Sequence, residues 1–276
     1  MTTQEIMELA LEMAGFTSVP PDSAIYVPGM EIRKVLFGID IDTAELMLAR
    51  ELKCDAVISH HPHGAMINWY LPEAWRVYAT HLTLLKQHGI PEDEAVAAVE
   101  PGLLRWSLEC QGSNYDRTVS IARLLNIPFM NIHQPLDEIG RRIIQAKIDE
   151  TIAEYGPRTR VQDLVDSLAT IPELARAKTE IRVMVGDPQA KVGKAVMVHG
   201  ALTNGGYEVA ATYFRHGIDT IVYIHAAPDV VARLRKEHHG NLIVTGHIAS
   251  DAVGIMPFIA ALRARGLEVI PINGLS

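Results

Sequence analysis

Histidines stand where predicted apolar strands end, and aspartates accompany two of them. The group consists of His60 and His61 after residues 55–59, His133 and Asp137 after residues 127–132, His225 after residues 219–224, and His247 and Asp251 after residues 242–246. Neutral imidazole and carboxylate together suit divalent transition metals. A single histidine at such a place is more often structural, but the set as a whole predicts a metal site.

One pair in this group has the spacing of a helical turn. His247 and Asp251 are four residues apart at the start of a predicted helix, which places both side chains on one helix face. The alternative role for Asp251 is structural, because a carboxylate near a helix start stabilises the helix by about 0.3–1 kcal/mol.

Alternating strands and helices would bring these groups together. Residues 34–40 and 54–62 are apolar strands joined by a helix over 43–53, a βαβ unit that predicts a parallel sheet. The C-terminal part alternates in the same way, with strands expected at 194–200, 219–225, 241–246 and 267–272 and helices at 207–217, 230–240 and 248–266. Ligands bind beyond the carboxyl ends of the strands in such sheets.

The rest of the chain is predicted to be mainly helical. Helices are expected over 1–16, 71–88 and 119–126, and residues 19–29 are rich in turn formers. Mixed charge over 138–158 indicates a solvated surface helix without chemistry, followed by a helical connector over 159–178. We therefore expect an N-terminal α/β lobe over 1–137, a helical connector over 138–193 and a C-terminal α/β lobe over 194–276, both lobes contributing to one site.

The two lobes resemble each other in sequence. Residues 34–62 and 194–228 both run strand, small residues, helix, Asp, strand, histidine and Pro. This order predicts an internal duplication, with the general likeness of any two βαβ units as the alternative.

Composition excludes several classes of function. The 276 residues carry 25 basic and 33 acidic side chains, a net charge of -8 without a basic run, which disfavours nucleic-acid binding. Cys54 and Cys110 form no metal or redox motif. No stretch of 18 apolar residues and no export signal is present, so we expect a cytoplasmic protein outside the membrane. Dinucleotide, P-loop, zincin and hydrolase-elbow motifs are also absent.

Four segments resemble the Nif-three-like family of dinuclear metal proteins, also named type 2 GTP cyclohydrolase I homologues. They are residues 38–62, 133–137, 216–225 and 245–255, in the family's order. The resemblance implies two similar α/β lobes facing each other across a metal-binding cleft, and homo-oligomers that are commonly hexameric rings. It also implies the metal ligands His60, His61, Asp137, His247 and Asp251.

The chain departs from the family pattern at three places. Asp251 stands where the family has Glu, and His225 stands where it usually has Thr-Gly-Glu. The glycine-rich stretch expected after the strand at 194–199 is His199-Gly200-Ala201.

Two bound metals would favour hydrolysis of a small molecule or nucleotide by a metal-activated water. We expect two divalent ions per chain, with zinc, iron, manganese and nickel all compatible with the ligand types. His63, His133 and His225 are candidates for proton transfer or for orienting a ligand. The alternatives are a non-catalytic protein whose metals stabilise a binding or regulatory fold, and a small-molecule binding module without metal.

Overall fold

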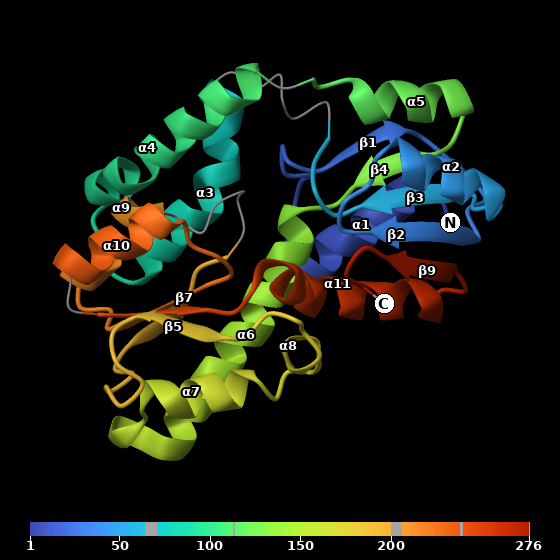
Figure 1. Ribbon diagram of the computed structural model, residues 1–276. Helices are drawn as coiled ribbons and strands as arrows, with labels where there is room; N and C mark the ends of the chain where they lie inside the picture. The colour runs from blue at the N-terminus through green and yellow to red at the C-terminus, as the bar shows by residue number, and fades with distance from the viewer. Residues whose placement is uncertain (64–70, 113, 200–205, 238–239, 276) are drawn as a thin grey trace. The chain divides into compact units, whose positions relative to one another are not determined.

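The computed structural model describes residues 1–63, 71–112, 114–199, 206–237 and 240–275 (Figure 1). The chain divides into two compact units. Unit 1 comprises residues 1–77, 106–139 and 254–276, and unit 2 comprises residues 78–105 and 140–253. Each unit is built around its own sheet. Residue 200 of the strand predicted over 194–200, residues 238–239 of the helix predicted over 230–240, and Gly200 and Ala201 of the expected glycine-rich stretch lie outside the described residues.

Unit 1 contains a five-stranded sheet in the order β1-β4-β3-β2-β9. Its strands are β1 (Ala24–Val27), β2 (Lys34–Gly38), β3 (Ala56–Ser59), β4 (Phe129–Asn131) and β9 (Glu268–Ile272). β2, β3, β4 and β9 run parallel, and β1 is antiparallel to β4 at the edge. The parallel strands therefore end at the same edge of the sheet, where β3 leads into His60 and His61.

Helices cover this sheet and close the core of unit 1. They are α1 (Thr3–Ala14), α2 (Thr43–Glu51) and α5 (Arg117–Leu125), seen around the sheet in Figure 1. Leu46 of α2 and Val119 of α5 are buried against Leu36 of β2. A capping box fixes the start of α2, because Asp42 accepts from Thr43 N while Glu45 accepts from Asp42 N. The predicted βαβ unit over 34–62 is confirmed.

Unit 2 contains a four-stranded sheet in the order β5-β8-β7-β6. Its strands are β5 (Arg182–Val185), β6 (Ala195–Met197), β7 (Thr220–Tyr223) and β8 (Asn241–Val244). β6, β7 and β8 are parallel, and β5 is antiparallel to β8. The associated helices are α9 (Gly206–Arg215) and α10 (Pro228–Glu237), as the sequence alternation predicts.

The two sheets have matching strand orders. Each has an antiparallel edge strand, β1 or β5, followed by three parallel strands in reverse chain order, and β9 is the addition in unit 1. A helix follows the equivalent strands β4 and β8: α6 (Gln134–Tyr155) and α11 (His247–Ala264). The expectation of an α/β fold with two similar lobes is confirmed.

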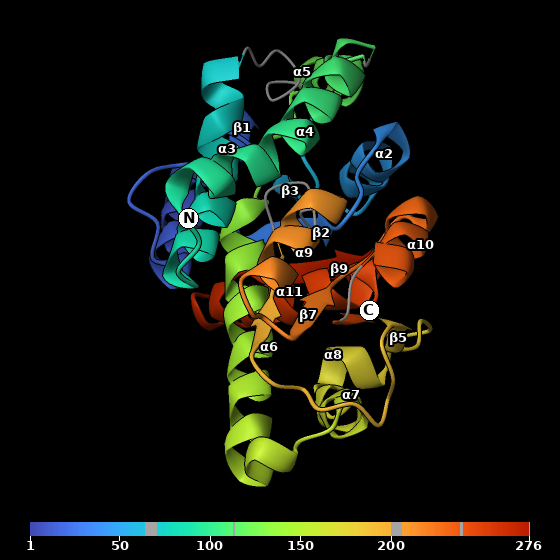
Figure 2. The same ribbon diagram turned by 90° about the vertical axis from the view of Figure 1, so that its left-hand side faces the viewer.

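The helix predicted over 138–158 differs from expectation in start and burial. α6 begins at Gln134, so Asp137 lies in its first turn. Ile144 and Ile148 are fully buried in the core of unit 2 together with Leu164 of α7 (Val161–Leu168). Figure 2 shows α7 beside the later part of α6. The prediction of a solvated helix is wrong for this face, because apolar residues at helical spacing outweigh the charges around them.

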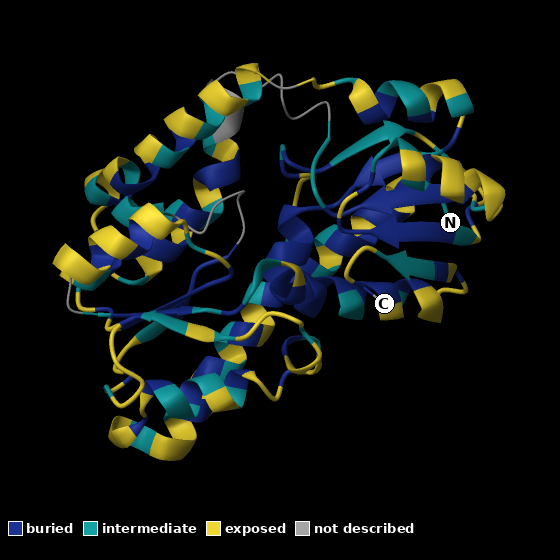
Figure 3. Cartoon of the chain, viewed as in Figure 1, coloured by how far each residue is buried: buried dark blue, intermediate teal, exposed yellow. Residues whose placement is uncertain are grey.

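Further helices complete the units. α3 (Leu71–Gln87) agrees with the predicted helix over 71–88, and α8 (Pro172–Ala175) follows α7 after the short η2 (Gly156–Arg158). α4 (Glu92–Gln111) is a helix that the sequence patterns did not predict. Figure 3 shows the inner strands β3, β4, β7 and β8 mostly in the colour of buried residues, whereas the edge strands β1, β5 and β9 are mainly intermediate. Among the described residues, no helix is long and apolar enough to cross a membrane.

Candidate metal centre

Three histidines of unit 1 meet beyond the ends of β3 and β4. His60 and His61 follow Ser59 of β3, and His133 follows β4 by two residues. One ring nitrogen from each of the three lies within 4.8 Å of the others. The ring centroids of His60 and His133 are 4.8 Å apart. The structure therefore confirms that these separate sequence segments come together.

Each of these imidazoles has its Nδ1 against an oxygen acceptor. His60 Nδ1 donates to Ile132 O at 3.0 Å. His61 Nδ1 lies 2.6 Å from Asp40 Oδ1, and His133 Nδ1 lies 2.8 Å from Asp22 Oδ2. An acceptor at Nδ1 holds the proton there, fixes the ring orientation and makes Nε2 the atom that binds a metal.

Asp137 lies between two of these rings. Its Oδ1 is 3.2 Å from His60 Nε2, and its Oδ2 is 3.6 Å from His133 Nε2. Both distances exceed the usual length of a charge-assisted hydrogen bond, about 2.8 Å. Two donors that each lie about 2.1 Å from a tetrahedral ion are about 3.4 Å apart. The spacing of Asp137 and the two imidazoles is therefore that of ligands around an ion.

Burial and charge act in opposite directions on His133. Burial lowers its pKa, while the carboxylates of Asp137 and Asp22 raise it, and the net effect is a pKa above the usual histidine value. The His133 side chain is 7% exposed, and that of Asp22 is fully buried. His133 is thus a buried imidazole that two carboxylates favour in its protonated form.

A hydrogen-bond network holds Asp22 next to His133. The Asp22 carbonyl accepts from Asn131 Nδ2 at 2.7 Å, and Ser23 Oγ accepts from His133 N at 2.9 Å. Tyr26 Oη donates to Asn131 Oδ1 at 2.7 Å. The turn-rich segment before β1 therefore supplies positioning groups, and its composition alone gave no signal for this role.

His63 lies in different surroundings from the three clustered histidines. Its ring packs against Phe129 and Tyr26, and its Nε2 lies 3.1 Å from Ser59 Oγ. Burial lowers its pKa to about 4, so the ring is neutral near pH 7. His63 therefore packs among aromatic side chains and does not belong to the cluster of His60, His61 and His133.

Unit 2 carries a second group of imidazole and carboxylate donors. His247 Nε2 lies 3.4 Å from Asp251 Oδ2, four residues later in the first turns of α11, which confirms their expected placement on one helix face. Gly246 enters this helix with φ +99°, a conformation that favours glycine. The Asp251 side chain is 1% exposed, whereas that of His247 is 40% exposed.

Two further histidines of unit 2 accompany this pair. The rings of His225 and His247 are 4.9 Å apart. Loss of solvation lowers the pKa of His225, with Asp251 raising it and His199 lowering it. His199 Nε2 lies 3.8 Å from Asp251 Oδ1. The sequence patterns did not single out His199 as a ligand; its position near the end of the strand predicted over 194–200 was the available signal.

The donors in both units fit divalent transition metals. Each group joins imidazole nitrogens to one buried carboxylate near the start of a helix, Asp137 in α6 and Asp251 in α11. Burying a carboxylate costs free energy unless charges or metals compensate it. The ligand types admit zinc, iron, manganese and nickel alike.

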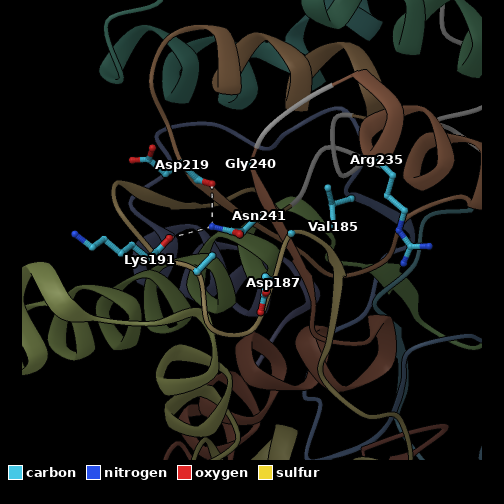
Figure 4. Close-up of a pocket in the computed structure, with 9 residues that line it drawn as sticks. Val185, Asp187, Lys191, Asp219, Arg235, Gly240 and Asn241 are labelled. Atoms are coloured by element: carbon cyan, nitrogen blue, oxygen red, sulfur yellow. Dashed lines mark hydrogen bonds between the residues drawn. The ribbon is translucent and has the colours of Figure 1, made fainter.

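A pocket of about 440 Å³ in unit 2 lies at the other ends of these strands. Asp219 precedes β7 and Asn241 begins β8, whereas His225 and His247 follow the carboxyl ends. Figure 4 shows the Asn241 amide between the backbones of Asp219 and Lys191, to which its Nδ2 donates. Asn241 thus links the start of β8 to the segments that precede β6 and β7 through hydrogen bonds.

Comparisons with solved structures give the same family as the sequence motifs. No family model matches the chain, and no curated protein matches it either. Two structures support the fold alone: reduced HcgD from Methanocaldococcus jannaschii (14% identity, 98% of this chain and 97% of that chain, TM-score 0.60) and a Bacillus cereus protein related to NIF3 (12% identity, 99% and 96%, TM-score 0.53). A NIF3 superfamily protein from Sphaerobacter thermophilus is 49% identical over 100% of this chain and 99% of its own, with a TM-score of 0.95. With this identity over the full length, the chain belongs to the NIF3 superfamily.

Proposed function

We propose that this protein binds two divalent transition-metal ions through His60, His61, Asp137, His247 and Asp251, and uses them to hydrolyse a small molecule or nucleotide. The observation that carries the proposal is the Nδ1 contact of each clustered imidazole in unit 1 with an oxygen acceptor. Such contacts are typical of histidines that bind metals through Nε2.

The proposal assigns both groups of donors to one dinuclear centre. Its support is the resemblance of the motifs to those of the Nif-three-like family, together with the equivalent construction of the two groups. Each group has a histidine four residues before a buried aspartate, namely His133 with Asp137 and His247 with Asp251.

When bound, the two ions would supply a water acidified toward neutral pH and a Lewis acid for the substrate. His133 is the residue that fits proton transfer best, since Asp22 orients its ring and raises its pKa. His225 is the corresponding candidate in unit 2. His63, with a pKa lowered to about 4, fits a role in orienting the strand end rather than as an acid at neutral pH.

A non-catalytic protein with structural metals is the second candidate. The observation in its favour is burial, because His60 is fully buried and Asp137 is 2% exposed. Ions bound at such residues contribute directly to the free energy of folding. The resulting protein would bind or regulate another molecule without turning it over.

A turnover assay separates the two candidates. Metal-loaded protein is tested on phosphoesters, nucleotides and amides, beside His61→Ala and the control His216→Ala, whose imidazole contacts Glu94 of unit 2. Hydrolysis that His61→Ala loses while its melting curve is retained supports the enzyme. The structural candidate predicts no turnover and a lowered melting temperature for His61→Ala or after chelation.

The family resemblance carries one further proposal, that the protein assembles as a homo-oligomer, most simply a hexameric ring. Light scattering coupled to size-exclusion chromatography measures the mass of the assembly. A mass of one 30.4 kDa chain would exclude it.

A further inference from the structure

His199 is a buried histidine that the five proposed metal ligands leave out. It lies two residues beyond β6, at the same sheet edge as the residues that follow β7 and β8. Its side chain is 1% exposed. A histidine with this burial beyond the carboxyl end of a parallel strand lies where α/β proteins bind ligands.

The carboxylate of Asp251 lies between His199 and His247. Its Oδ1 is 3.8 Å from His199 Nε2, and its Oδ2 is 3.4 Å from His247 Nε2. The two imidazoles therefore lie next to different oxygens of one carboxylate. Asp137 in unit 1 has the same arrangement, with His60 at Oδ1 and His133 at Oδ2.

We propose that His199 is a metal ligand, binding through Nε2 an ion held on the Oδ1 side of Asp251. This inference rests on the proposed function, because it adds a protein ligand to one of the two proposed ions. His247 would then hold an ion on the Oδ2 side of the same carboxylate.

The distances favour ligation over a plain ion pair. A charge-assisted hydrogen bond between imidazole and carboxylate is about 2.8 Å long, as His133 and Asp22 show at 2.8 Å. The 3.8 Å between His199 and Asp251 is too long for such a bond. Two donors about 2.1 Å from one ion lie up to about 4.2 Å apart, so an ion fits between these atoms.

The extra imidazole also offsets a difference from the family motif. Asp251 stands where the resemblance leads us to expect Glu, and its side chain is one methylene shorter. The shorter carboxylate of Asp251 would extend less far toward an ion. An imidazole nitrogen on the Oδ1 side would supply a further ligand and compensate for this difference. His199 stands where a glycine-rich stretch was expected, so both departures occur in the same group of residues.

Metal content of three variants tests the inference. Wild-type protein, His199→Gly, His199→Gln and the control His216→Ala, whose imidazole contacts Glu94, are loaded with zinc, dialysed and analysed by plasma mass spectrometry. We expect about two ions per chain in the wild type and in His216→Ala, and about one in His199→Gly and in His199→Gln. Free imidazole in the buffer should restore the lost ion, because it can occupy the space of the deleted ring and bind zinc.

The outcomes separate the two proposals. A wild type without bound zinc contradicts the proposed function. A wild type with two ions and a His199→Gly variant with the same content contradicts only the role of His199. Loss of zinc that imidazole does not restore, in His199→Gly and equally in His199→Gln, would assign His199 a packing role and overturn the inference.

Discussion

His133 and Asp22 form a buried pair in unit 1, with Nδ1 and Oδ2 2.8 Å apart. They are separated by 111 positions in the chain, and the hydrogen bonds of Ser23 and Asn131 bring them together. The pair directs His133 Nε2 toward Asp137. A carboxylate outside the proposed ligand set therefore controls the orientation of the imidazole that we propose for proton transfer.

Replacing Asp22 by Asn should weaken metal binding without unfolding the protein. The amide keeps the size of the side chain but removes the negative charge that orients His133 beside the proposed ligand Asp137, and loss of a group that positions a ligand changes metal affinity by about 10–100-fold. Competition with a chromophoric chelator measures the affinity. Glu268→Gln is the control for lost charge, since Glu268 pairs with Lys34 at the surface. Equal affinities for Asp22→Asn and wild type would contradict this role.

Asp42 should stabilise the protein in a pH-dependent way. The Thr43 amide lowers the pKa of Asp42, loss of solvation opposes this effect, and Arg117 and Thr118 lower it further. A lowered folded-state pKa means that the stabilisation is complete above the unfolded value of about 3.9 and is lost as the pH falls through the folded value. Asp42→Ala should cost about 1 kcal/mol at pH 7 and progressively less in acid.

Urea unfolding at several pH values measures this effect. Asp116→Ala is the matched control, because Asp116 precedes α5 without a side-chain capping bond. A cost for Asp42→Ala that stays constant down to about pH 2 would show that the ionised carboxylate is not its source.

Gly246→Ala should destabilise the start of α11 more than an ordinary glycine substitution. A Cβ at residue 246 would clash with Thr179 Oγ1, in addition to the strain of φ +99°. Gly266 has φ +86°, and a Cβ added there would meet nothing within 4 Å, so Gly266→Ala reports the strain alone. We expect about 1 kcal/mol for Gly266→Ala and at least about 1 kcal/mol more for Gly246→Ala. Equal losses of unfolding free energy in Gly246→Ala and Gly266→Ala would contradict a steric contribution from Thr179.

The strand ends and the histidines and aspartates that gather there could be predicted from the sequence because local patterns encode them. An apolar run followed by His60 and His61 identifies a strand and its carboxyl end, where ligands bind in α/β sheets. The spacing of His247 and Asp251 places both on one helix face, as the structure confirms. Such signals depend only on the periodicity of strands and helices.

The orienting carboxylates could not be predicted because long-range pairing determines them. Asp22 precedes its partner by 111 residues, and Asp40 lies 21 residues before His61. Both stand in turn-rich segments, where aspartate is common for local reasons. Asp22 and Asp40 reach the histidines only because β2, β3 and β4 lie side by side in the folded sheet.

The missed helix has a different cause. Pro101 and Gly102 stand in the middle of α4, and both residues usually end helices. Val99 and Leu103 are nevertheless almost fully buried, and packing of this face compensates the local cost. Tertiary contacts decide such segments, so sequence periodicity alone underestimates them.

Metal analysis of natively purified protein tests the central claim most directly. Wild type is compared with His61→Ala and Asp251→Ala by plasma mass spectrometry after exhaustive dialysis. A dinuclear centre predicts about two transition-metal ions per chain in the wild type and clearly less in both variants. Less than about 0.2 ion per chain in the wild type, unchanged in the variants and not restored by added zinc, iron, manganese or nickel, would contradict a metal site at these residues.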